Sequence, residues 1–327
     1  MTETPAGLPL IFTHYGNTEY LARSLAAARL TNPGKRLVLI GDAANRQTAL
    51  AAGWEHVLLD DYASELGAEF RSVFKVIKGK QHISPPGDRN WIQYVLERWF
   101  ILTAFAKAEG LASFWHFDSD VMIVASLDPF ETALRAEGID YTKQCSGKCL
   151  NGYVTTPVAE DYCRYIVKFF QDEDRLAAFQ RQFDEQNPTF ALTEMEAFAS
   201  YDRQPPAFRG CHLESHFPGW WFDDVLCECD GCDTVRMGGL GPAIKDVRFN
   251  GTEFSVDCNG QTRKLAAVNC SWLPTSVFDW ILARTRIAVS GQGFSGEERL
   301  GALWPGVRHV YRAFRARFQA MLKLALD

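Results

Sequence analysis

Two carboxylates interrupt an apolar run in the middle of the chain, and their types and spacing suit metal chemistry. The run spans residues 114–124, in which Asp118 and Asp120 are separated by one serine. Because an unpaired buried charge is costly, acids in such a run usually face a cation or a water-filled cleft. At strand spacing, residues i and i+2 project from the same face, so the two carboxylates are expected side by side. Such a pair suits Mg²⁺ or Mn²⁺, which leave coordination positions open for the phosphates of a substrate.

The same Asp-x-Asp spacing occurs again at Asp172 and Asp174. That second pair lies in the polar run 171–175, directly after two phenylalanines, and is typical of a solvated helix end. The spacing alone is therefore weak, and the apolar context is what distinguishes the first pair.

The elements that must position these acids alternate between strand and helix in the first part of the chain. Short apolar runs predict strands, and apolar residues at helical spacing predict helices between them. Helices between successive strands imply parallel pairing with right-handed crossovers, which is an α/β fold. The predicted strands are 8–14, 37–40, 54–59 and 114–124, the predicted helices are 18–30, 43–52, 91–108, 158–170 and 192–201, and hairpin-like segments are predicted at 247–258 and 265–269.

Polar side chains follow three of the predicted strands. In α/β sheets, ligands bind beyond the carboxyl ends of the strands, so these side chains are expected at one rim. Turn residues of the same types also end strands for purely structural reasons, which is the alternative interpretation of each. The expected rim consists of Thr13, His14, Tyr15, Asp42, Asp118 and Asp120.

Composition limits the class of protein. The chain has 327 residues, 47% of them hydrophobic, and a net charge of −6, which argues against nucleic acid as the main partner. Residues 1–9 lack the pattern of a secretory signal, and no apolar run reaches the ~20 residues of a membrane span, so we expect a cytoplasmic protein. Nine cysteines fit reduced thiols better than a disulfide framework.

Three of the cysteines form a C-x-C-x₂-C cluster at Cys227, Cys229 and Cys232. Cys211, His212 or His216 could supply the fourth ligand of a structural zinc site. Because the spacing matches no common zinc pattern, buried or loop thiols are the favoured interpretation.

The sequence resembles the GT-A class of nucleotide-sugar glycosyltransferases in three features. These are the α/β first half, the long helix containing Glu97-Arg98-Trp99, and the strand ending in Asp118-Ser119-Asp120-Val121. The resemblance covers about residues 8–200. It implies a GT-A-like, Rossmann-type mixed sheet flanked by helices in a single main domain, and Mn²⁺ or Mg²⁺ bridging the diphosphate of the donor. Carried over by position, it makes Asp118 and Asp120 the metal carboxylates, His14 and Tyr15 nucleoside contacts beside Thr13 and Asp42 at the donor rim, and Asn151 and Gly152 the sugar-binding turn. It makes Arg98 a donor contact, with an ion pair to Glu194 or to a surface acid as the alternative.

The resemblance also implies an active-site acid in the segment 192–196. Breaking a bond between sugar and diphosphate develops negative charge on the phosphate and positive charge on the anomeric carbon. Glu194 would act as general base in an inverting reaction or stabilise the oxocarbenium-like centre in a retaining one, and Glu196 is the competing candidate. A structural role for Glu194 at a helix start is the alternative.

One departure from the family pattern concerns the metal. Many metal-dependent members supply a histidine from a late strand, whereas here the apolar segment 265–268 leads into Asn269-Cys270-Ser271. His212 and His216 are the nearest histidine substitutes. The third protein ligand is therefore left open.

Two further segments are candidates for acceptor and membrane contact. Trp220 and Trp221, followed by Asp223 and Asp224, could hold a sugar by stacking and hydroxyl hydrogen bonds, with core packing as the alternative. Residues 307–325 place apolar residues on one helical stripe with arginines outside it. This pattern is typical of an interfacial helix at the inner face of a membrane, although docking on the protein's own core is the commoner arrangement.

These observations predict a cytoplasmic, metal-assisted glycosyltransferase of hexosyltransferase type, which acts in polysaccharide biosynthesis. It would move a sugar from a nucleotide-sugar donor, a UDP-sugar, to a hydroxyl of a glycan or lipid-linked glycan acceptor. The expected domains are a catalytic domain at 1–298, with a nucleotide half 1–125 and an acceptor half 126–298, and a basic amphipathic helix at 299–327. The alternatives are a sugar-phosphate nucleotidyltransferase, although residues 13–18 lack its Gly-rich, Arg-containing loop, and a non-catalytic carbohydrate-binding protein on a degenerate GT-A scaffold.

Overall fold

The first part of the chain folds as the alternation of strands and helices that its sequence pattern predicts. The computed structural model describes residues 7–83, 90–205, 207–228 and 231–303. Every residue of the first two strands is buried. The elements are β1 (Leu10–Thr13), α1 (Leu21–Thr31), β2 (Leu37–Gly41), α2 (Arg46–Ala51), β3 (Glu55–Leu58) and the 3₁₀ turn η1 (Leu59–Tyr62).

Two helices precede the acidic strand. The sequence analysis did not predict α3 (Glu65–Val73), whose start is capped by the Ser64 hydroxyl accepting the N–H of Gly67. The prediction for α4 (Trp91–Ala108) is confirmed with the same bounds, because Asn90 caps its start and apolar residues follow one another on nearly every face. α4 is therefore a core helix.

The acidic run is two strands rather than one, which corrects the prediction for residues 114–124. β4 (Ser113–Asp118) belongs to the first sheet, and β5 (Val121–Ile123) belongs to the second. Between them Ser119 and Asp120 form a turn, because the ring of His14 holds the Ser119 hydroxyl and the N–H of Cys270 bonds to the carbonyl of Asp120. Asp118 thus ends a strand, whereas Asp120 lies at the junction of two sheets.

The first sheet is mixed. Its strand order is β3-β2-β1-β4-β7-β6-β8, with β6 (Tyr141–Gln144), β7 (Cys149–Thr155) and β8 (Gly210–His212) added to the predicted strands. The first four strands in this order are parallel, β7 runs antiparallel to both β4 and β6, and β8 runs parallel to β6. The parallel half brings the carboxyl ends of β1, β2 and β4 to one edge.

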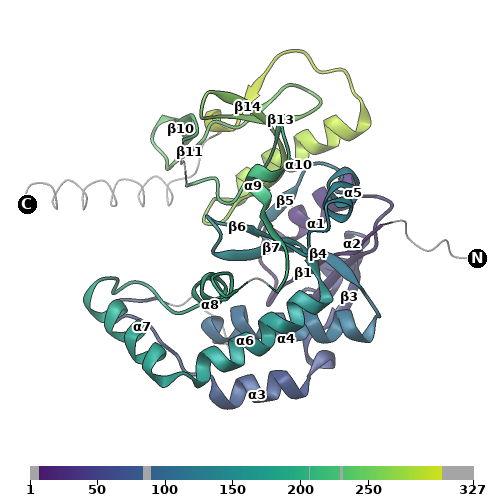
Figure 1. Ribbon diagram of the computed structural model, residues 1–327. Helices are drawn as coiled ribbons and strands as arrows, with labels where there is room; N and C mark the ends of the chain where they lie inside the picture. Colours follow the sequence, from purple (N-terminus) through teal and green to yellow (C-terminus); the bar gives the residue numbers. More distant parts are fainter. Residues whose placement is uncertain (1–6, 84–89, 206, 229–230, 304–327) are drawn as a thin grey trace, which may run out of the picture.

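Helices cover both faces of this sheet. Figure 1 shows α3, α4, α6 (Thr156–Gln171), α7 (Glu173–Glu185) and α8 (Glu194–Tyr201) gathered on one side, away from α1 and α5 (Asp128–Ala136). Aromatic residues of α4, α6 and α8 share a single buried cluster. The second Asp-x-Asp sequence falls at the start of α7, where the carboxylate of Asp172 caps the helix by accepting the N–H of Arg175. It is a helix-end feature, as its polar context predicts.

A smaller antiparallel sheet carries the rest of the chain. Its order is β15-β12-β13-β14-β5, and β9 runs parallel beside β14. The hairpin predicted at 247–258 is confirmed as β12 and β13, whereas segment 265–269 is the end of the single strand β14. The helix α10 packs against both this sheet and α1. The remaining elements are α9 (Leu213–His216), β9 (Trp220–Phe222), β10 (Thr234–Arg236), η2 (Met237–Gly239), β11 (Ala243–Lys245), β12 (Arg248–Phe249), β13 (Phe254–Cys258), β14 (Gln261–Asn269), α10 (Thr275–Ser290), β15 (Glu298–Arg299) and η3 (Leu300–Ala302).

Together the two sheets confirm the predicted fold class, a single α/β domain with a central mixed sheet flanked by helices. The division at residues 125 and 298 stays a prediction, and the amphipathic helix predicted at 307–325 lies outside the described residues. Within the described ranges, no helix combines the length and the apolar character needed to cross a membrane.

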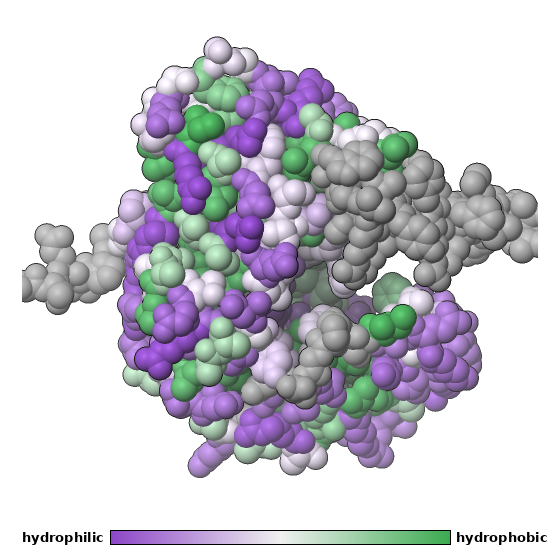
Figure 2. All heavy atoms as spheres, turned by 180° about the vertical axis from the view of Figure 1, so that it is seen from behind, coloured by the Kyte–Doolittle hydropathy of each residue, from purple (hydrophilic) through white to green (hydrophobic). Residues whose placement is uncertain are grey.

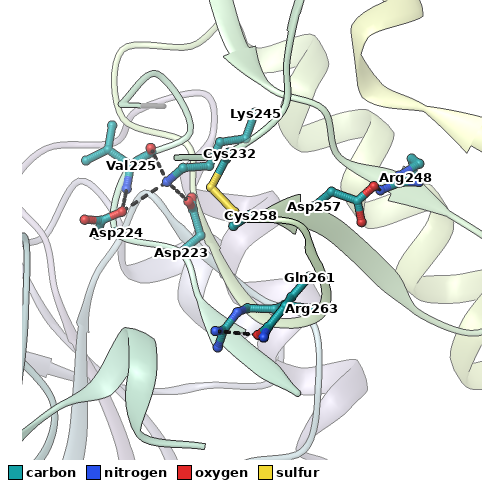
Figure 3. Close-up of a disulfide and its surroundings, with 10 residues drawn as sticks. All are labelled: Asp223, Asp224, Val225, Cys232, Lys245, Arg248, Asp257, Cys258, Gln261 and Arg263. Atoms are coloured by element: carbon teal, nitrogen blue, oxygen red, sulfur yellow. Dashed lines mark hydrogen bonds and ion pairs between the residues drawn. A yellow bond between two sulfur atoms is a disulfide. The ribbon is translucent and has the colours of Figure 1, made fainter. Parts of the chain in front are cut away.

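A disulfide between Cys232 and Cys258 corrects the prediction that the cysteines are reduced (Figure 3). The two residues pair across an antiparallel bridge between the end of β13 and the segment before β10, a contact that 26 residues of separation conceal in the sequence. This bond removes Cys232 from the proposed zinc cluster. Among the residues that the structure describes, which do not include Cys229, no group of three His, Cys, Asp or Glu side chains is arranged for a metal.

Replacing both Cys232 and Cys258 with serine is expected to lower the free energy of unfolding by about 2–4 kcal/mol, because the bond restricts the unfolded chain. Urea unfolding of oxidised protein measures the loss, and Cys211→Ser, which removes a free thiol, is the matched control. Alkylation of both cysteines without prior reduction, or unchanged stability on adding dithiothreitol, would contradict the assignment.

Candidate active site

The carboxyl ends of β1, β2 and β4 meet at one rim. The strand register places Thr13 of β1 opposite Ile40 of β2 on one side and opposite Asp118 of β4 on the other. His14, Tyr15 and Asp42 follow directly, so the structure brings together the polar residues expected there. Seen from behind, the molecule is hollowed between its upper and lower parts, with hydrophilic residues over much of the surface on either side (Figure 2).

His14 holds the turn between the two acids. Its Nδ1 lies 2.7 Å from the Ser119 hydroxyl, and its Nε2 lies 3.2 Å from the Thr18 hydroxyl. Burial lowers the pKa of His14 to about 4, against the opposing charge of Asp42, so the ring is neutral at neutral pH. His14 therefore positions Asp118 and Asp120 by hydrogen bonds rather than by charge.

Asp42 supports the loop that follows β1. Its carboxylate accepts the N–H of Gly16 at 2.6 Å and the N–H of Ala44 at 2.9 Å. The amide of Asn45 donates to the carbonyls of His14 and Gly16 from the same side. The loop at the end of β1 is thus fixed before any ligand arrives.

Arg98 bridges two acids from different elements. Its guanidinium donates to Asp118 at 2.5 Å and to Glu194 at 2.8 Å, and its side chain is only 11% exposed. Burial would lower the pKa of Arg98, but the two carboxylates raise it, so the side chain stays charged. The long helix α4 therefore places a fixed positive charge between the end of β4 and the start of α8.

Asp118 and Asp120 have opposite electrostatic surroundings. Burial opposes ionisation of Asp118, yet the adjacent Arg98 lowers its pKa. For Asp120, burial and then the charge of Asp118 raise the pKa to about 6. One oxygen of Asp120 accepts the Ser271 hydroxyl at 2.6 Å, while Oδ1 is buried and has no hydrogen-bond partner within the described chain. Asp120 is a carboxylate whose charge the neighbouring residues leave uncompensated.

The surroundings of Asp120 fit a divalent cation without a histidine. His212 lies 3.2 Å from Glu214, and His216 lies 3.1 Å from Glu137, so the structure does not bring either of the suggested substitutes to the acids. Ser271 is there instead, and its hydroxyl oxygen also lies 2.7 Å from the amide oxygen of Asn269. Carboxylate, amide and hydroxyl oxygens are ligands that Mg²⁺ and Mn²⁺ accept, with water and phosphate oxygens completing the shell.

The two candidate catalytic acids differ in what they contact. Glu196 completes a capping box, in which its carboxylate accepts the N–H and the hydroxyl of Thr193, each at 2.9 Å. Glu194 accepts a hydrogen bond from Arg98 through Oε1, while its Oε2 is buried without a partner in the part of the chain described. Burial raises the pKa of Glu194 to about 7, although Arg98 opposes the shift. Glu194 can therefore exchange a proton near neutral pH, whereas Glu196 is engaged in the helix cap.

Asn151 and Gly152 lie inside the strand β7, which corrects the expectation of a turn at these residues. The Asn151 amide donates to Gln144 at 2.7 Å. Gly152 has a φ of +91°, and a Cβ there would come within 2.5 Å of both Leu213 and Thr142. Only glycine fits at this position, since both the backbone conformation and the packing exclude a side chain.

The paired tryptophans lie away from the acid cluster. Trp220 and Trp221 pair with Lys264 and Leu265 in the middle of β14, whereas Asn269 ends that strand. Trp220 packs edge-on against Phe130, with ring centroids 5.2 Å apart. Asp223, predicted to accept sugar hydroxyls beside them, is fully buried and bonded to Lys245 at 2.5 Å (Figure 3). That interpretation of Asp223 is wrong, because the acid serves a buried ion pair.

Sequence reasoning missed the contribution of Ser271 and of Tyr162, whose hydroxyl donates to the carbonyl of Glu194 at 2.8 Å. Ser271 had a usable signal, because it follows the late strand at which a metal ligand was expected. Tyr162 had none, since an aromatic residue inside an amphipathic helix is usually core.

No protein-family model matches the sequence, and no curated protein matches it either. Among solved structures, the apo form of mouse xyloside xylosyltransferase 1 aligns with a TM-score of 0.42 at 10% identity, over 65% of this chain and 86% of its own. The PaToxG glycosyltransferase aligns with a TM-score of 0.35 at 11% identity, over 54% and 68% respectively. The glycosyltransferase GlyE of Streptococcus pneumoniae TIGR4 aligns with a TM-score of 0.33 at 10% identity, over 64% and 46%. These are distant similarities of fold, and the functional argument therefore rests on the acid cluster.

Proposed function

We propose that this protein is a glycosyltransferase that uses a divalent cation and a nucleotide-diphosphate sugar as donor. A UDP-sugar is the first candidate for the donor. The acceptor would be a hydroxyl of a glycan or of a lipid-linked glycan. The observation that carries the proposal is the uncompensated carboxylate of Asp120 beside Asp118, at a strand-end rim, with Arg98 connecting the pair to Glu194. Buried carboxylate oxygens in native structures usually have hydrogen-bond partners, so the unpaired oxygens of Asp120 and Glu194, in one cluster with Arg98, favour a ligand at this site.

Asp118 and Asp120 would hold the cation, with the hydroxyl of Ser271 fixing the orientation of Asp120. When bound, Mg²⁺ or Mn²⁺ supplies positive charge to the diphosphate of the donor. Arg98 keeps Asp118 ionised and fixed in place, so this carboxylate needs no reorganisation as charge develops. Thr13, His14, Tyr15 and Asp42 would line the nucleoside side of the same rim.

Glu194 would serve the sugar end of the reaction. With its pKa raised to about 7, a large fraction of the carboxylate is ionised near neutral pH and basic enough to accept a proton from the acceptor hydroxyl. If the reaction retains configuration, the same carboxylate would stabilise the positive anomeric centre. Arg98 restrains Glu194 through one oxygen and leaves the other for the substrate.

The location of the enzyme stays a prediction. Residues proposed to contact the membrane, 307–325, lie outside the described ranges. A cytoplasmic enzyme would also carry the Cys232–Cys258 bond in a compartment where disulfides are uncommon.

Thermal unfolding with candidate ligands tests the proposal. UDP, UDP-glucose, UDP-galactose and GDP-mannose are each added with Mn²⁺, with EDTA, or alone, and UMP serves as a control that lacks the diphosphate. A ligand that binds only the folded protein stabilises it by about 2.7 kcal/mol at a hundredfold excess over its Kd. We expect a diphosphate nucleotide to raise the Tm only when the cation is present. If no nucleotide changes the Tm, the protein is not a nucleotide-sugar enzyme.

A further inference from the structure

Trp272 is an exposed aromatic residue directly beside Asp118 and Asp120, the acids proposed to hold the cation. Its side chain is 78% exposed, whereas every other tryptophan in the described ranges is buried or partly buried. Leaving so large an apolar surface in water forgoes the stabilisation that burial would provide. An isolated exposed tryptophan therefore invites a functional explanation when it adjoins a site.

The backbone at Trp272 is in the left-handed region, with a φ of +69°. Glycine, asparagine and aspartate adopt this conformation readily, but a bulky side chain does so at a cost in conformational energy. Strain of this kind persists where the surrounding structure enforces it, and it concentrates at ligand-binding sites. A glycine at this position would form the same turn without strain, so the turn alone does not explain the tryptophan.

The segment that carries Trp272 is fixed to Asp120 at several points. Cys270 donates its N–H to the carbonyl of Asp120 at 3.1 Å, and Ser271 donates its hydroxyl to the carboxylate at 2.6 Å. Leu273 closes the turn by donating its N–H to the carbonyl of Cys270 at 3.1 Å. Trp272 lies between these anchored residues, so its backbone is held next to Ser271, which orients the proposed cation ligand Asp120.

We propose that Trp272 is the stacking platform for a sugar ring of the acceptor, an inference that rests on the proposed function. A tryptophan face binds the apolar C–H face of a pyranose, while the hydroxyls of the sugar remain available to polar neighbours. Trp272 follows β14 of the second sheet, whereas the proposed nucleoside contacts Tyr15 and Asp42 follow strands of the first sheet. The donor and the acceptor would therefore approach the acids from elements of different sheets. This position takes over the acceptor role first assigned to Trp220 and Trp221.

Three variants separate binding from structure. Trp272→Gly removes the ring and suits the left-handed backbone, so its Tm is expected to equal or exceed that of the wild type. Trp272→Phe keeps an aromatic face. Phe190→Ala removes another exposed aromatic side chain, 55% exposed and outside the acid cluster, and is the matched control.

The direct readout is the indole N–H resonance of Trp272 in full-length protein labelled with ¹⁵N-tryptophan, assigned by its absence in Trp272→Phe. The probe is a mixture of the methyl glycosides of glucose, galactose and mannose, added with UDP and Mg²⁺ present. We expect the glycosides to shift this resonance, and UDP with Mg²⁺ alone to leave it unchanged. A shift caused by UDP alone would assign Trp272 to the nucleobase, and no response to any glycoside would overturn the proposal.

Kinetics keep this inference separate from the proposed function. The Trp272→Gly variant is expected to raise the KM for a glycoside acceptor about tenfold, on the scale of one aromatic stacking contact. Its rate of donor hydrolysis by water, which needs no acceptor, should stay within twofold of wild type, as should both rates in Phe190→Ala. If wild-type protein hydrolyses the donor but Trp272→Gly leaves the acceptor KM unchanged, the proposed stacking role of Trp272 is wrong. The proposed glycosyltransferase function then still holds. If no nucleotide sugar is bound or hydrolysed, the proposed function fails, and the resonance test still decides whether Trp272 contacts a sugar.

Discussion

In the Asp120→Asn variant, the rate of metal-dependent sugar transfer is expected to fall by a factor on the order of 10²–10³. This is the effect of removing one preorganised electrostatic contact from an active site. Asparagine has nearly the same shape and can still accept the hydroxyl of Ser271. It lacks the negative charge that would hold the cation. Transfer of labelled sugar from a UDP-sugar, measured across a series of Mn²⁺ concentrations, checks this expectation.

The same variant should be at least as stable as the wild type. In the wild type without metal, the pKa of Asp120 is raised to about 6, so the folded protein binds a proton more tightly than the unfolded chain. The contribution of Asp120 to stability therefore falls as pH rises from the ordinary aspartate pKa towards 6 and is level above it. Asp120→Asn removes this fall, and saturating Mn²⁺ should remove it in the wild type, because the cation compensates the ionised carboxylate.

The second Asp-x-Asp sequence of the chain offers the control. Asp174→Asn changes an exposed acid in the first turn of α7 and should leave transfer and metal dependence unchanged. Equal turnover in Asp120→Asn and wild type, or an unchanged Mn²⁺ requirement, would show that Asp120 holds no catalytic cation.

The Glu194→Gln variant is expected to lower the turnover number by about 10²–10⁴-fold, the usual contribution of a general base. The wild-type rate should rise with pH and level off above about 7, because burial raises the pKa of Glu194 to that value and only the ionised form accepts a proton. The residual rate of the variant should lack this step. Initial rates over a pH series, at saturating donor and metal, measure both effects.

Glu196→Gln is the matched control for Glu194. The amide oxygen of a glutamine there can still accept a hydrogen bond from the N–H of Thr193, so the capping box and the helix start are retained. We expect nearly full activity and an unchanged pH profile. If Glu196→Gln abolishes turnover while Glu194→Gln retains it, the roles of the two acids are reversed.

Local periodicity was sufficient to predict much of the scaffold. The run of apolar residues in 91–108 defined α4 to the residue, and the strand ends that form the rim followed from short apolar runs ended by polar residues. Asp118 was found because it ends an apolar strand, and Arg98 because its place on the preceding helix resembles the GT-A pattern. These are properties of neighbouring residues, and neighbouring residues are what a sequence displays directly.

The remaining features depend on contacts between distant residues. Ser271 and Asp120 are 151 positions apart, and only the pairing of β14 with β5 brings them together. The same pairing splits the acidic run into two strands, because β5 leaves the first sheet to join the second. The link from Arg98 to Glu194 spans 96 positions and depends on how α8 packs against α4 and α6. No periodicity within either segment encodes such a contact.

Because the turn at Ser119 and Asp120 passes the chain from one sheet to the other, the acid cluster is complete only when both sheets have formed. Arg98 can meet Asp118 once the first sheet exists, but Asp120 gains its partners only when β14 has been made and paired. Until then β5 has an unpaired edge of apolar residues, the kind of edge that promotes association between chains. A chain interrupted before residue 261 would therefore combine an incomplete site with an aggregation-prone strand, so activity would report complete folding of both sheets.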